Sequence, residues 1–300
     1  MVTFKQLEAL YWIAQLGSFE AAATKLNMSQ SAISKRIVEL EDTFSVAMFD
    51  RTRRTARLTT KGSLLLEHAT DLLYRRDQML GEVSDKTALV GRYRIGVTEL
   101  TAMTWLPSLV EAVSEVYPRL QLEPVVEVGA ELFRKFEQDH LDLVVLPDIF
   151  SDSRSIAVAL QTVDFAWMCS PKLLDTERAW NLQELSQQKL IAQGASSGSG
   201  LLYQKWFADE SVYFPNTVTA SNLLAQVGLT MSGLGMSYLP KRCLQHLLER
   251  GDLGEIHCEP PLPDINYVAL YRPGRWIGVS QDIGVIAQRL CNFSKLLIAG

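Results

Sequence analysis

Near the N-terminus, apolar residues recur at helical spacing. They stand three or four residues apart, or side by side, at Phe4, Leu7, Leu10, Tyr11 and Ala14. This pattern predicts an amphipathic helix that ends at Gly17, with Ser18 as the cap of a second helix in the alanine-rich run "FEAAATKL". Asn27 tolerates the left-handed backbone of a tight bend, so it is expected to form the turn that follows.

A third helix is predicted over "QSAISKRIVELE", with Ser29 as its cap. Its apolar residues share one side of the helix and are Ile33, Ile37 and Leu40. The other side is small, polar and lightly cationic, with Gln30, Ser31, Ser34 and Lys35. Two helices joined by a short turn, the second with such a polar face, make a helix-turn-helix, which places its second helix in the major groove of DNA.

The stretch "FDRTRRTARLTTKG", which begins at Phe49, is predicted to form a hairpin after that motif. Met48 and Phe49 would anchor it to the helices, and residues 56–58 would return as its second strand. Residues 52–55 would form its tip, and the candidate DNA-contacting arginines of the hairpin are Arg51, Arg53 and Arg54. A hairpin that follows a recognition helix is called a wing, and its arginines would reach phosphates or the adjacent minor groove. The alternative is a solvated loop whose arginines pair with surface acids, although Asp50 is the one acid in the stretch.

A long helix is predicted from Thr59 or Thr60 to about Asp85. One stripe along it holds Leu65, Ala69, Leu72, Arg76, Met79 and Val83, and a neighbouring stripe holds Leu66, Leu73 and Leu80. So broad an apolar face requires a partner, most simply the same helix of a second subunit. Packing of the helix onto its own chain is the alternative. Two subunits would also place two recognition helices in successive major grooves, as a two-fold DNA site requires.

Beyond residue 90 the pattern changes to alternating strands and helices. "YRIGV", "LEPVVEV" and "LDLVVLP" indicate strands separated by helices, which is typical of a parallel sheet covered by helices. A second run begins near Val163 and includes "VDFAWMCS", "KLIAQG", "NTVTAS" and "GMSYLP". The chain then returns through "INYVALY" to a final helix, predicted from Val279 to about Leu297. Ligands of open α/β sheets bind beyond the carboxyl ends of strands, so two such units facing each other would form a cleft.

Composition agrees with a soluble protein of several packing units. No apolar run reaches the ~20 residues of a membrane span. The N-terminus does not resemble a signal peptide and the four cysteines show no paired pattern, so cytoplasmic localisation is expected. The chain carries 29 Lys and Arg against 34 Asp and Glu, yet residues 1–62 carry nine against six. A basic N-terminal unit on an acidic body indicates that only the first unit meets a polyanion.

The N-terminal motifs together resemble those of the LysR-type transcriptional regulators. The resemblance rests on "GSFEAAATKLNMSQSAISKRIVELE" and "MFDRTRRTARLTTKG", and more loosely on "GVTELTAMTWLPSLVEAV", "LDLVVLP" and "LLAQVGLTMSGLGMSYLP". There are two departures: Ser31 replaces a proline often found at the start of the recognition helix, and Phe44-Ser45 stands where a glycine is common.

The resemblance implies an α plus α/β fold, in which a winged helix-turn-helix and a long linker helix precede a two-lobed effector domain like a periplasmic binding protein. The expected domains are residues 1–60, 61–88 and 89–300, with lobe I at about 91–162 and 268–300 and lobe II at about 163–267. Such a protein binds double-stranded operator DNA and responds to a small-molecule effector. The expected assembly is a homodimer or homotetramer, and RNA polymerase is a candidate further partner. No enzymatic activity, cofactor or metal is implied.

By this resemblance, the base-reading residues lie on the third helix and the phosphate-contacting residues flank it. An amide pairs well with adenine and a lysine with guanine. Two serines would offer helix N-termini to phosphate. The predicted DNA-contacting set is Ser18, Ser29, Gln30, Ser31, Ser34, Lys35, Arg51, Arg53 and Arg54.

The loop after the first strand of the effector domain resembles the effector-contacting loop of the family. Across the cleft, "GASSGSG" precedes a helix, where N–H groups and hydroxyls would hold an anion. The predicted effector-contacting set is Thr98, Glu99, Leu100, Thr101, Gly129, Pro147, Asp148, Gly194, Ser196, Ser197 and Ser199. A flexible Gly/Ser loop is the alternative interpretation. Glu99 and Asp148 favour a ligand with an amine, and the Ser/Gly loop opposite favours an anion. Together they suggest a zwitterion such as an amino acid.

Two short motifs suggest other chemistry. The run from Gly194 to Gly198 ("GASSG") fits the G-x-S-x-G turn of a serine hydrolase, with His246 or His257 as base and Asp209 as its partner. Hydrolysis is therefore the alternative function. A set of zinc-type ligands is formed by Cys243, His246, His257 and Cys258, but its spacing follows no familiar zinc finger.

Overall fold

The chain forms two compact units, which are Met1–Val83 with Pro273–Gly278, and Ser84–Arg272 with Val279–Gly300. The computed structural model describes all residues except 51–54, 84–85, 153, 273–275 and 298–300. None of the helices in the described ranges is both long and apolar enough to cross a membrane.

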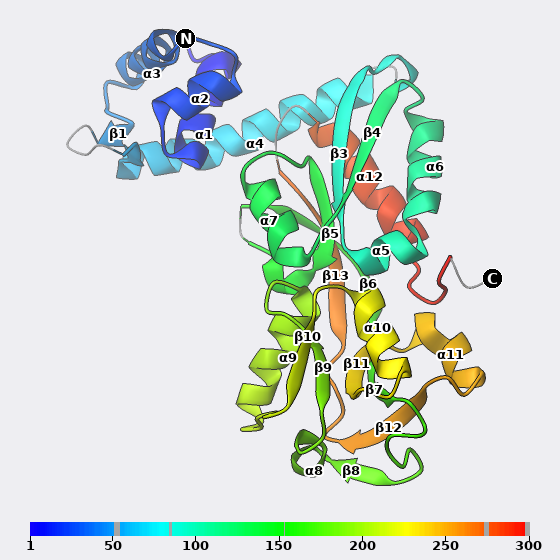
Figure 1. The fold of residues 1–300 in the computed structure, drawn as a ribbon. Coiled ribbons are helices and arrows are strands. Elements are labelled where there is room, and N and C mark those ends of the chain that lie inside the picture. Colours follow the sequence, from blue (N-terminus) through cyan, green and yellow to red (C-terminus); the bar gives the residue numbers. More distant parts are fainter. Residues whose placement is uncertain (51–54, 84–85, 153, 273–275, 298–300) are drawn as a thin grey trace. The chain divides into compact units, whose positions relative to one another are not determined.

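The first unit begins with three helices (Figure 1), which are α1 (Phe4–Leu16), α2 (Phe19–Lys25) and α3 (Gln30–Phe44). The predicted local signals are confirmed. Gly17 has a φ of 66° and ends α1, and the side chains of Ser18 and Ser29 cap α2 and α3. Asn27 has a φ of 51° in the turn between α2 and α3. The apolar faces of the helices meet in one core, in which Leu40 is fully buried.

A short hairpin follows α3, as predicted. β1 (Phe49–Asp50) pairs in antiparallel register with β2 (Arg57–Leu58). The buried Glu41 carboxylate accepts hydrogen bonds from Met48 N at 2.7 Å and Phe49 N at 3.4 Å, so α3 fixes the start of the hairpin. The predicted arginines of the wing, which are Arg51, Arg53 and Arg54, lie outside the described residues.

The long helix α4 (Thr60–Val83) begins at the predicted cap, because the Thr59 hydroxyl accepts from Gly62 N at 3.0 Å. Part of its apolar face packs against its own chain and is not available to a second subunit. Four residues of the predicted stripes pack against the core of their own chain: Leu65, Leu66, Ala69 and Leu73. Arg76 pairs with Glu8 of α1 at 2.6 Å. Among the described side chains of α4, the large apolar ones that are exposed are Leu64, Leu72, Met79 and Val83, and Leu80 of the predicted stripe is not among the side chains described.

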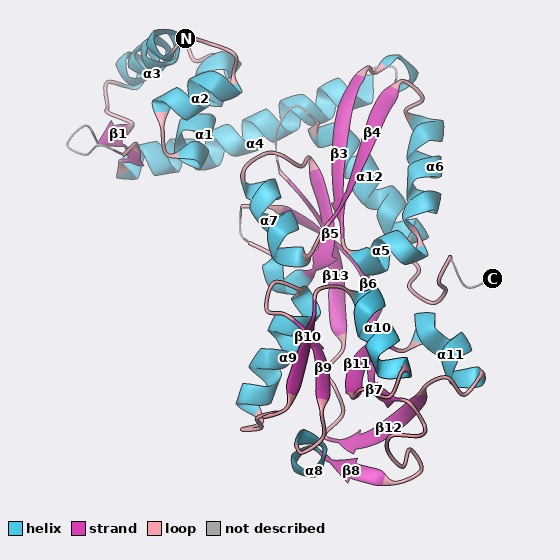
Figure 2. Cartoon of the chain, viewed as in Figure 1, coloured by secondary structure: helices cyan, strands magenta, loops and turns pink. Residues whose placement is uncertain are grey.

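The second unit contains two sheets (Figure 2), and we call the first sheet with its helices lobe I. Its strand order is β4–β3–β5–β13–β6, in which β4, β3 and β5 are parallel and β13 is antiparallel to both neighbours. The strands are β3 (Gly91–Val97), β4 (Leu120–Val126), β5 (Leu143–Pro147), β6 (Ile156–Val163) and β13 (Ile265–Tyr271). The helices are η1 (Lys86–Ala88), α5 (Glu99–Thr104), α6 (Leu106–Val116), α7 (Gly129–Glu137), η2 (Asp148–Phe150) and α12 (Ile277–Leu290).

Helices cover both faces of the lobe I sheet. On one face, the Tyr93 hydroxyl lies 2.6 Å from that of Ser280 in α12. On the other, Leu132 and Phe136 of α7 pack against Val144 of β5. Because β5 is buried on both faces, its sequence "LVVLP" is continuously apolar, as predicted for a central parallel strand.

The second sheet with its helices is lobe II, with strand order β10–β9–β11–β7–β12–β8. The strands are β7 (Phe165–Cys169), β8 (Ala179–Asn181), β9 (Leu190–Gln193), β10 (Thr217–Ala220), β11 (Met236–Pro240) and β12 (Gly254–Glu259). The helices are α8 (Leu182–Ser186), α9 (Gly198–Asp209), α10 (Leu223–Met231), η3 (Arg242–Leu244) and α11 (Gln245–Glu249). Ser237 of β11 bonds Gln226 of α10 at 2.8 Å, whereas the ring of the next residue, Tyr238, lies 4.4 Å from Tyr203 of α9. The two helices therefore cover opposite faces.

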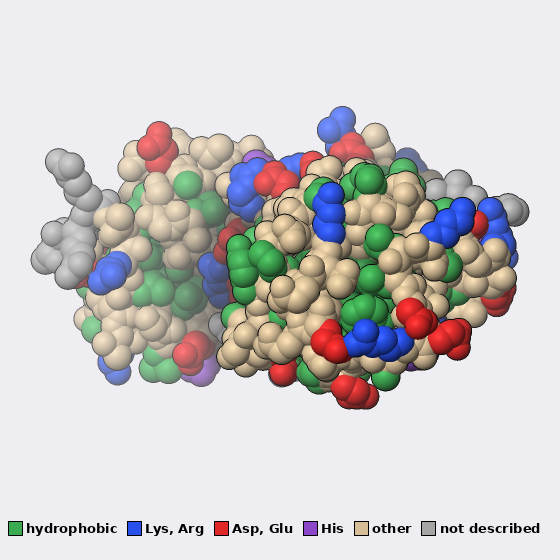
Figure 3. Space-filling view, turned by 60° about the horizontal axis from the view of Figure 1, so that its bottom comes forward, with side chains coloured by type: hydrophobic (Ala, Val, Ile, Leu, Met, Phe, Trp, Pro, Cys, Tyr) green, Lys and Arg blue, Asp and Glu red, His purple; other side chains and the backbone are tan. Residues whose placement is uncertain are grey.

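The chain passes from lobe I to lobe II at Asp164, between β6 and β7, and returns between β12 and β13. β13 already belongs to the lobe I sheet from Ile265, so the return lies slightly before the boundary expected at 267–268. Acidic and basic side chains are interspersed over the larger body in Figure 3, with no extended field of one sign on that face. Such a face does not favour a polyanion.

The final helix is shorter than predicted, because α12 ends at Leu290. In the segment that follows, Phe293 N donates to the Gln161 side chain at 3.4 Å and Leu297 N donates to Met103 O at 2.9 Å. These N–H groups bond distant parts of lobe I and so do not continue the helix.

Candidate functional site

The predicted base-reading residues lie on the side of α3 that faces away from the helical core. Gln30, Ser31 and Lys35 are exposed and Ser34 is half-buried. The Ser29 and Ser31 hydroxyls lie 3.0 Å apart at the start of the helix. α3 therefore presents a small polar surface with one lysine, and side chains of this kind can reach base edges in a major groove.

The two predicted phosphate-contacting serines are helix caps. The Ser18 hydroxyl accepts from Ala21 N at 3.4 Å, and that of Ser29 accepts from Ala32 N at 3.2 Å. A hydroxyl that accepts still has its own proton to donate. Each of the two side chains can therefore cap its helix and donate to a phosphate oxygen at the same time.

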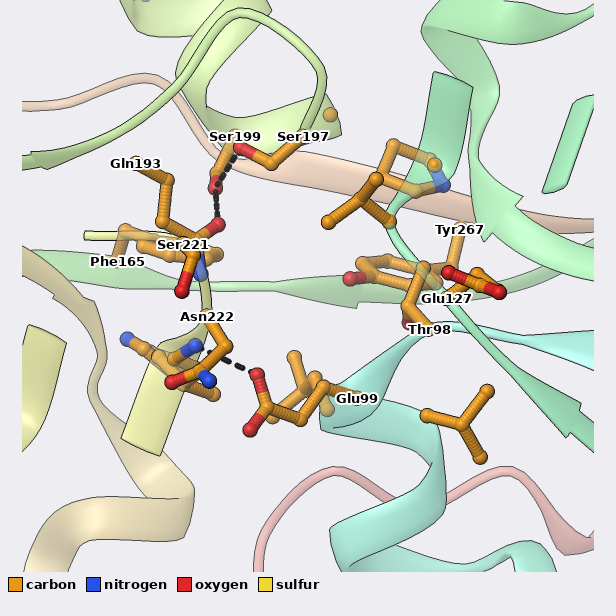
Figure 4. A pocket seen from close by; sticks show the side chains of 18 residues that line it. Thr98, Glu99, Glu127, Phe165, Gln193, Ser197, Ser199, Ser221, Asn222 and Tyr267 are labelled. Carbon is orange, nitrogen blue, oxygen red and sulfur yellow. Dashed lines mark hydrogen bonds between the residues drawn. The ribbon is translucent and has the colours of Figure 1, made fainter. Parts of the chain in front are cut away.

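A cavity of about 340 Å³ lies between lobe I and lobe II (Figure 4). Four helices begin at its wall, α5 and α7 from lobe I and α9 and α10 from lobe II. A helix N-terminus carries partial positive charge and N–H groups without intrahelical partners. A helix start whose N–H groups are not already bonded within the chain can thus bind hydrogen-bond acceptors of a small molecule.

The start of α9 leaves two N–H groups open to the cavity. The Ser197 hydroxyl accepts from Gly200 N at 2.9 Å and donates to Gly194 O at 3.0 Å, which caps the helix. The Ser199 hydroxyl donates to the Gln193 side chain at 2.7 Å. Within the described chain, the N–H groups of Gly198 and Ser199 have no hydrogen-bond partner. These two donors can hold an oxygen of a ligand.

The opposite side of the cavity is acidic. The Glu99 carboxylate accepts from Leu223 N of α10 at 2.6 Å and from Leu224 N at 3.4 Å. Glu127 pairs with Lys135 at 2.8 Å. The described lining contains these two carboxylates and no Lys, Arg or His. A cationic or hydrogen-bond-donating group of a ligand is therefore favoured on this side.

Tyr267 of β13 extends into the space between the lobes (Figure 4). Burial raises the pKa of its phenol to about 12, although a hydrogen bond with Thr98 opposes that rise. The phenol is thus neutral at physiological pH and can donate or accept a hydrogen bond. Phe165 and Pro240 add apolar surface from lobe II.

Seven of the eleven residues predicted to contact the effector line this cavity: Thr98, Glu99, Leu100, Gly129, Pro147, Ser197 and Ser199. Four do not. The fully buried Thr101 points inward and its hydroxyl lies 3.3 Å from that of Thr98. Asp148 begins η2 beyond the last lining residue of β5, and Gly194 uses its carbonyl to accept the α9 cap. Ser196 is exposed outside the cavity, where its carbonyl accepts from Ala130 N at 2.9 Å.

The predicted set did not contain the other lining residues, which are Val126, Glu127, Val128, Phe165, Gln193, Gly198, Ser221, Asn222, Leu223, Pro240 and Tyr267. The predicted loop "GASSGSG" did include Gly198. A usable signal existed for Gln193, which ends β9, and for Ser221 and Asn222, which follow β10 and precede α10. No such signal marked Tyr267, because only the antiparallel insertion of β13 between β5 and β6 brings it to the cavity.

The described residues form neither a serine hydrolase turn nor a zinc site. A nucleophile turn strains the backbone at its serine, yet the described non-glycine residues with positive φ are Asn27, Ser45, Asp139 and Ser211. The thiol of Cys243 is buried and donates to Pro240 O, and no three His, Cys, Asp or Glu side chains in the described ranges are grouped to hold a metal. Ser196 and the four zinc-type side chains therefore form no such centre in the described ranges.

Comparison with known proteins finds two family profiles that match successive parts of the chain. The family profile described as "Bacterial regulatory helix-turn-helix protein, lysR family" matches residues 4–63, and that described as "LysR substrate binding domain" matches residues 86–278. The uncharacterized HTH-type transcriptional regulator YbhD of Escherichia coli is 26% identical over 246 residues, which are 80% of this chain and 76% of YbhD. CfxR of Cupriavidus necator is 24% identical over 262 residues, which are 84% of this chain and 80% of CfxR.

Solved structures share the fold. A full-length OxyR variant from Pseudomonas aeruginosa superposes with a TM-score of 0.60 at 19% identity and covers 98% of this chain and 97% of its own. The effector-binding domain of QuiR in complex with shikimate superposes with a TM-score of 0.58 at 16% identity, over 67% of this chain and 97% of its own. With both family profiles matched in order, this chain belongs to the LysR-type transcriptional regulators, which bind DNA through an N-terminal helix-turn-helix and carry an effector-binding domain.

Proposed function

We propose that this regulator binds a two-fold operator through α3 and the wing, and that a small molecule in the cavity between lobes I and II modulates that binding. The observation that carries the proposal is the cavity itself. Four helix starts from two lobes meet there, with open donors on α9 and carboxylates opposite. A ligand that bridges the lobes would bind one lobe arrangement better than another, and such differential affinity is what couples two sites.

For DNA binding, the proposed base-reading residues are Gln30, Ser31, Ser34 and Lys35. Ser18 and Ser29 are proposed to contact phosphates, together with Arg51, Arg53 and Arg54 of the wing. The outward position of the α3 residues supports this assignment. For assembly, α4 is proposed to pair with the same helix of a second subunit through Leu72, Met79 and Val83, which are 47%, 55% and 82% exposed. Pairing of two dimers into a tetramer and contact with RNA polymerase are further proposals from the family resemblance.

Replacing Lys35 with alanine should weaken operator binding by about 1–3 kcal/mol, or roughly 5- to 150-fold, because it removes a cationic contact from α3. Fluorescence anisotropy with a labelled fragment of the upstream promoter region, repeated over a range of salt concentrations, would measure the loss. Lys205→Ala is the matched control, since it removes the same charge from an exposed position on α9. If the two variants bound the operator with equal affinity, the proposal that α3 contacts the base edges would be contradicted.

The effector is proposed to be amino-acid-like. Its carboxylate would bind the Gly198 and Ser199 N–H groups at the start of α9, and its amine would face the carboxylates of Glu99 and Glu127. A neutral Tyr267 hydroxyl and the apolar surface of Phe165 would contact the rest of the molecule. Asp148, which the sequence had suggested as a second acid near the amine, is replaced in this role by Glu127.

A thermal-shift screen of the full chain against amino acids and other metabolites is expected to find one class that raises the melting temperature. A ligand at a hundred times its Kd stabilises the form that binds it by about 2.7 kcal/mol. Ser199→Leu should abolish the shift, because the larger side chain enters the cavity, whereas Ser196→Leu should retain it, because Ser196 lies outside. Equal loss in both variants, or no response to any metabolite, would contradict the proposed site.

A further inference from the structure

The start of α10 differs from that of α9, because none of its first three helical N–H groups is open. Glu99 accepts from the first two N–H groups of α10, those of Leu223 and Leu224. The third, that of Ala225, donates to the Asn222 side chain at 2.7 Å. The N–H groups of Leu223, Leu224 and Ala225 therefore all have partners within the chain, and two of the three are held by one carboxylate.

This contact joins the two lobes across the cavity. Glu99 begins α5 of lobe I and α10 belongs to lobe II, and the dashed line in Figure 4 marks the bond between them. A second contact, from Ala130 N of α7 to Ser196 O, joins the lobes by their backbones at 2.9 Å. A carboxylate at a helix N-terminus is favoured both by charge-assisted hydrogen bonds and by the helix dipole. The chain thus supplies from its own sequence the group that a ligand carboxylate would otherwise provide.

We propose that Glu99 determines the charge of the effector, because its carboxylate fills the anion position at the start of α10. This inference rests on the proposed function of the cavity. With α10 occupied, a ligand can place one acidic group at the start of α9 and must present a neutral or cationic group toward α10. A dicarboxylate that needs both helix starts has to displace Glu99 and also meets Glu127, so the cavity excludes it.

Removal of the Glu99 side chain should turn the start of α10 into a binding site for free carboxylate. In Glu99→Ala the missing group is close to acetate in size and charge. The full-length variant should melt several degrees below the wild type in chloride, on the order of 3 °C, and acetate at equal ionic strength should restore most of that loss in a saturable manner. Acetamide, which lacks the charge, should restore none. Wild type should respond to acetate no more than to chloride.

Glu127→Ala is the matched control, because it removes a carboxylate from the same cavity that bonds Lys135 instead of a helix start. An acetate shift as large in wild type or Glu127→Ala as in Glu99→Ala would overturn the proposal, and so would no shift in Glu99→Ala. If that variant does not fold, Glu99→Ser leaves similar space and is judged by the same criteria. The acetate experiment needs no effector. If acetate rescues Glu99→Ala but no metabolite raises the melting temperature of the wild type, the contact between Glu99 and α10 stands and only the proposed effector role of the cavity is lost.

Discussion

Replacing Gly62 with alanine is expected to unfold the DNA-binding unit and abolish operator binding. A Cβ at this position would lie 2.1 Å from Met48 O and 3.0 Å from Met48 C, well inside van der Waals contact with the backbone. Met48 cannot move aside easily, because its N–H is held by the buried Glu41 carboxylate and its carbonyl accepts from Thr59 N at 2.9 Å. We expect a loss of about 3 kcal/mol or more, as for other overpacked core sites.

Circular dichroism melting and promoter-fragment anisotropy of the same preparation would measure both losses. Ser63→Ala is the matched control, since Ser63 is the next residue of α4 and is exposed, so its change should be within about 0.5 kcal/mol of wild type. If Gly62→Ala bound DNA as tightly as Ser63→Ala, the close packing of Gly62 in α4 against the Met48 backbone would be wrong.

Replacing Gly200 with alanine is expected to destroy the α9 side of the cavity. The added Cβ would lie 2.2 Å from Gly194 O and 2.6 Å from Gln193 O, so the helix has to move away from the end of β9. That movement breaks the Ser197 cap, which uses Gly200 N and Gly194 O, and displaces the two open N–H groups of α9. The cost is expected at about 2–4 kcal/mol, together with complete loss of any effector-induced thermal shift.

Gly228→Ala provides the control for Gly200→Ala, because it makes the same change inside a helix of the same lobe. Gly228 is exposed in α10 and a Cβ there would meet nothing within 4 Å. Alanine should therefore stabilise the helix by about 0.5–1 kcal/mol. Differential scanning calorimetry of the pair should show shifts of opposite sign. A lowered melting temperature in Gly228→Ala, or an unchanged one in Gly200→Ala, would contradict these local geometries.

The helices and caps of the DNA-binding unit were predictable because their signals are local. Ser18, Ser29 and Thr59 each bond an N–H group three residues away, and Gly17 and Asn27 each adopt the left-handed backbone that ends a helix. The strands of lobe I were predictable for a similar reason, since a fully buried strand such as β5 is apolar throughout. These features depend on neighbours in sequence, and no tertiary contact reversed them.

Contacts between distant segments could not be predicted in this way. Periodicity gave α4 one broad apolar face, but packing against α1 decides that Ala69 and Leu73 are buried in their own unit while Leu72 and Met79 are exposed. The strand ends indicated seven of the cavity residues, yet Tyr267 reaches the cavity only through the insertion of β13 into the lobe I sheet.

The sequence by itself therefore determined the helix-turn-helix, the exposed polar face of α3 and the family. The tertiary structure decided which groups at the cavity remain free to bind. Glu99 and Leu223 are 124 residues apart, and no local pattern relates a carboxylate to a helix start in the other lobe. Short-range hydrogen bonds and periodicity are fixed by adjacent residues, whereas the pairing of a charge with a distant helix depends on how the two lobes pack.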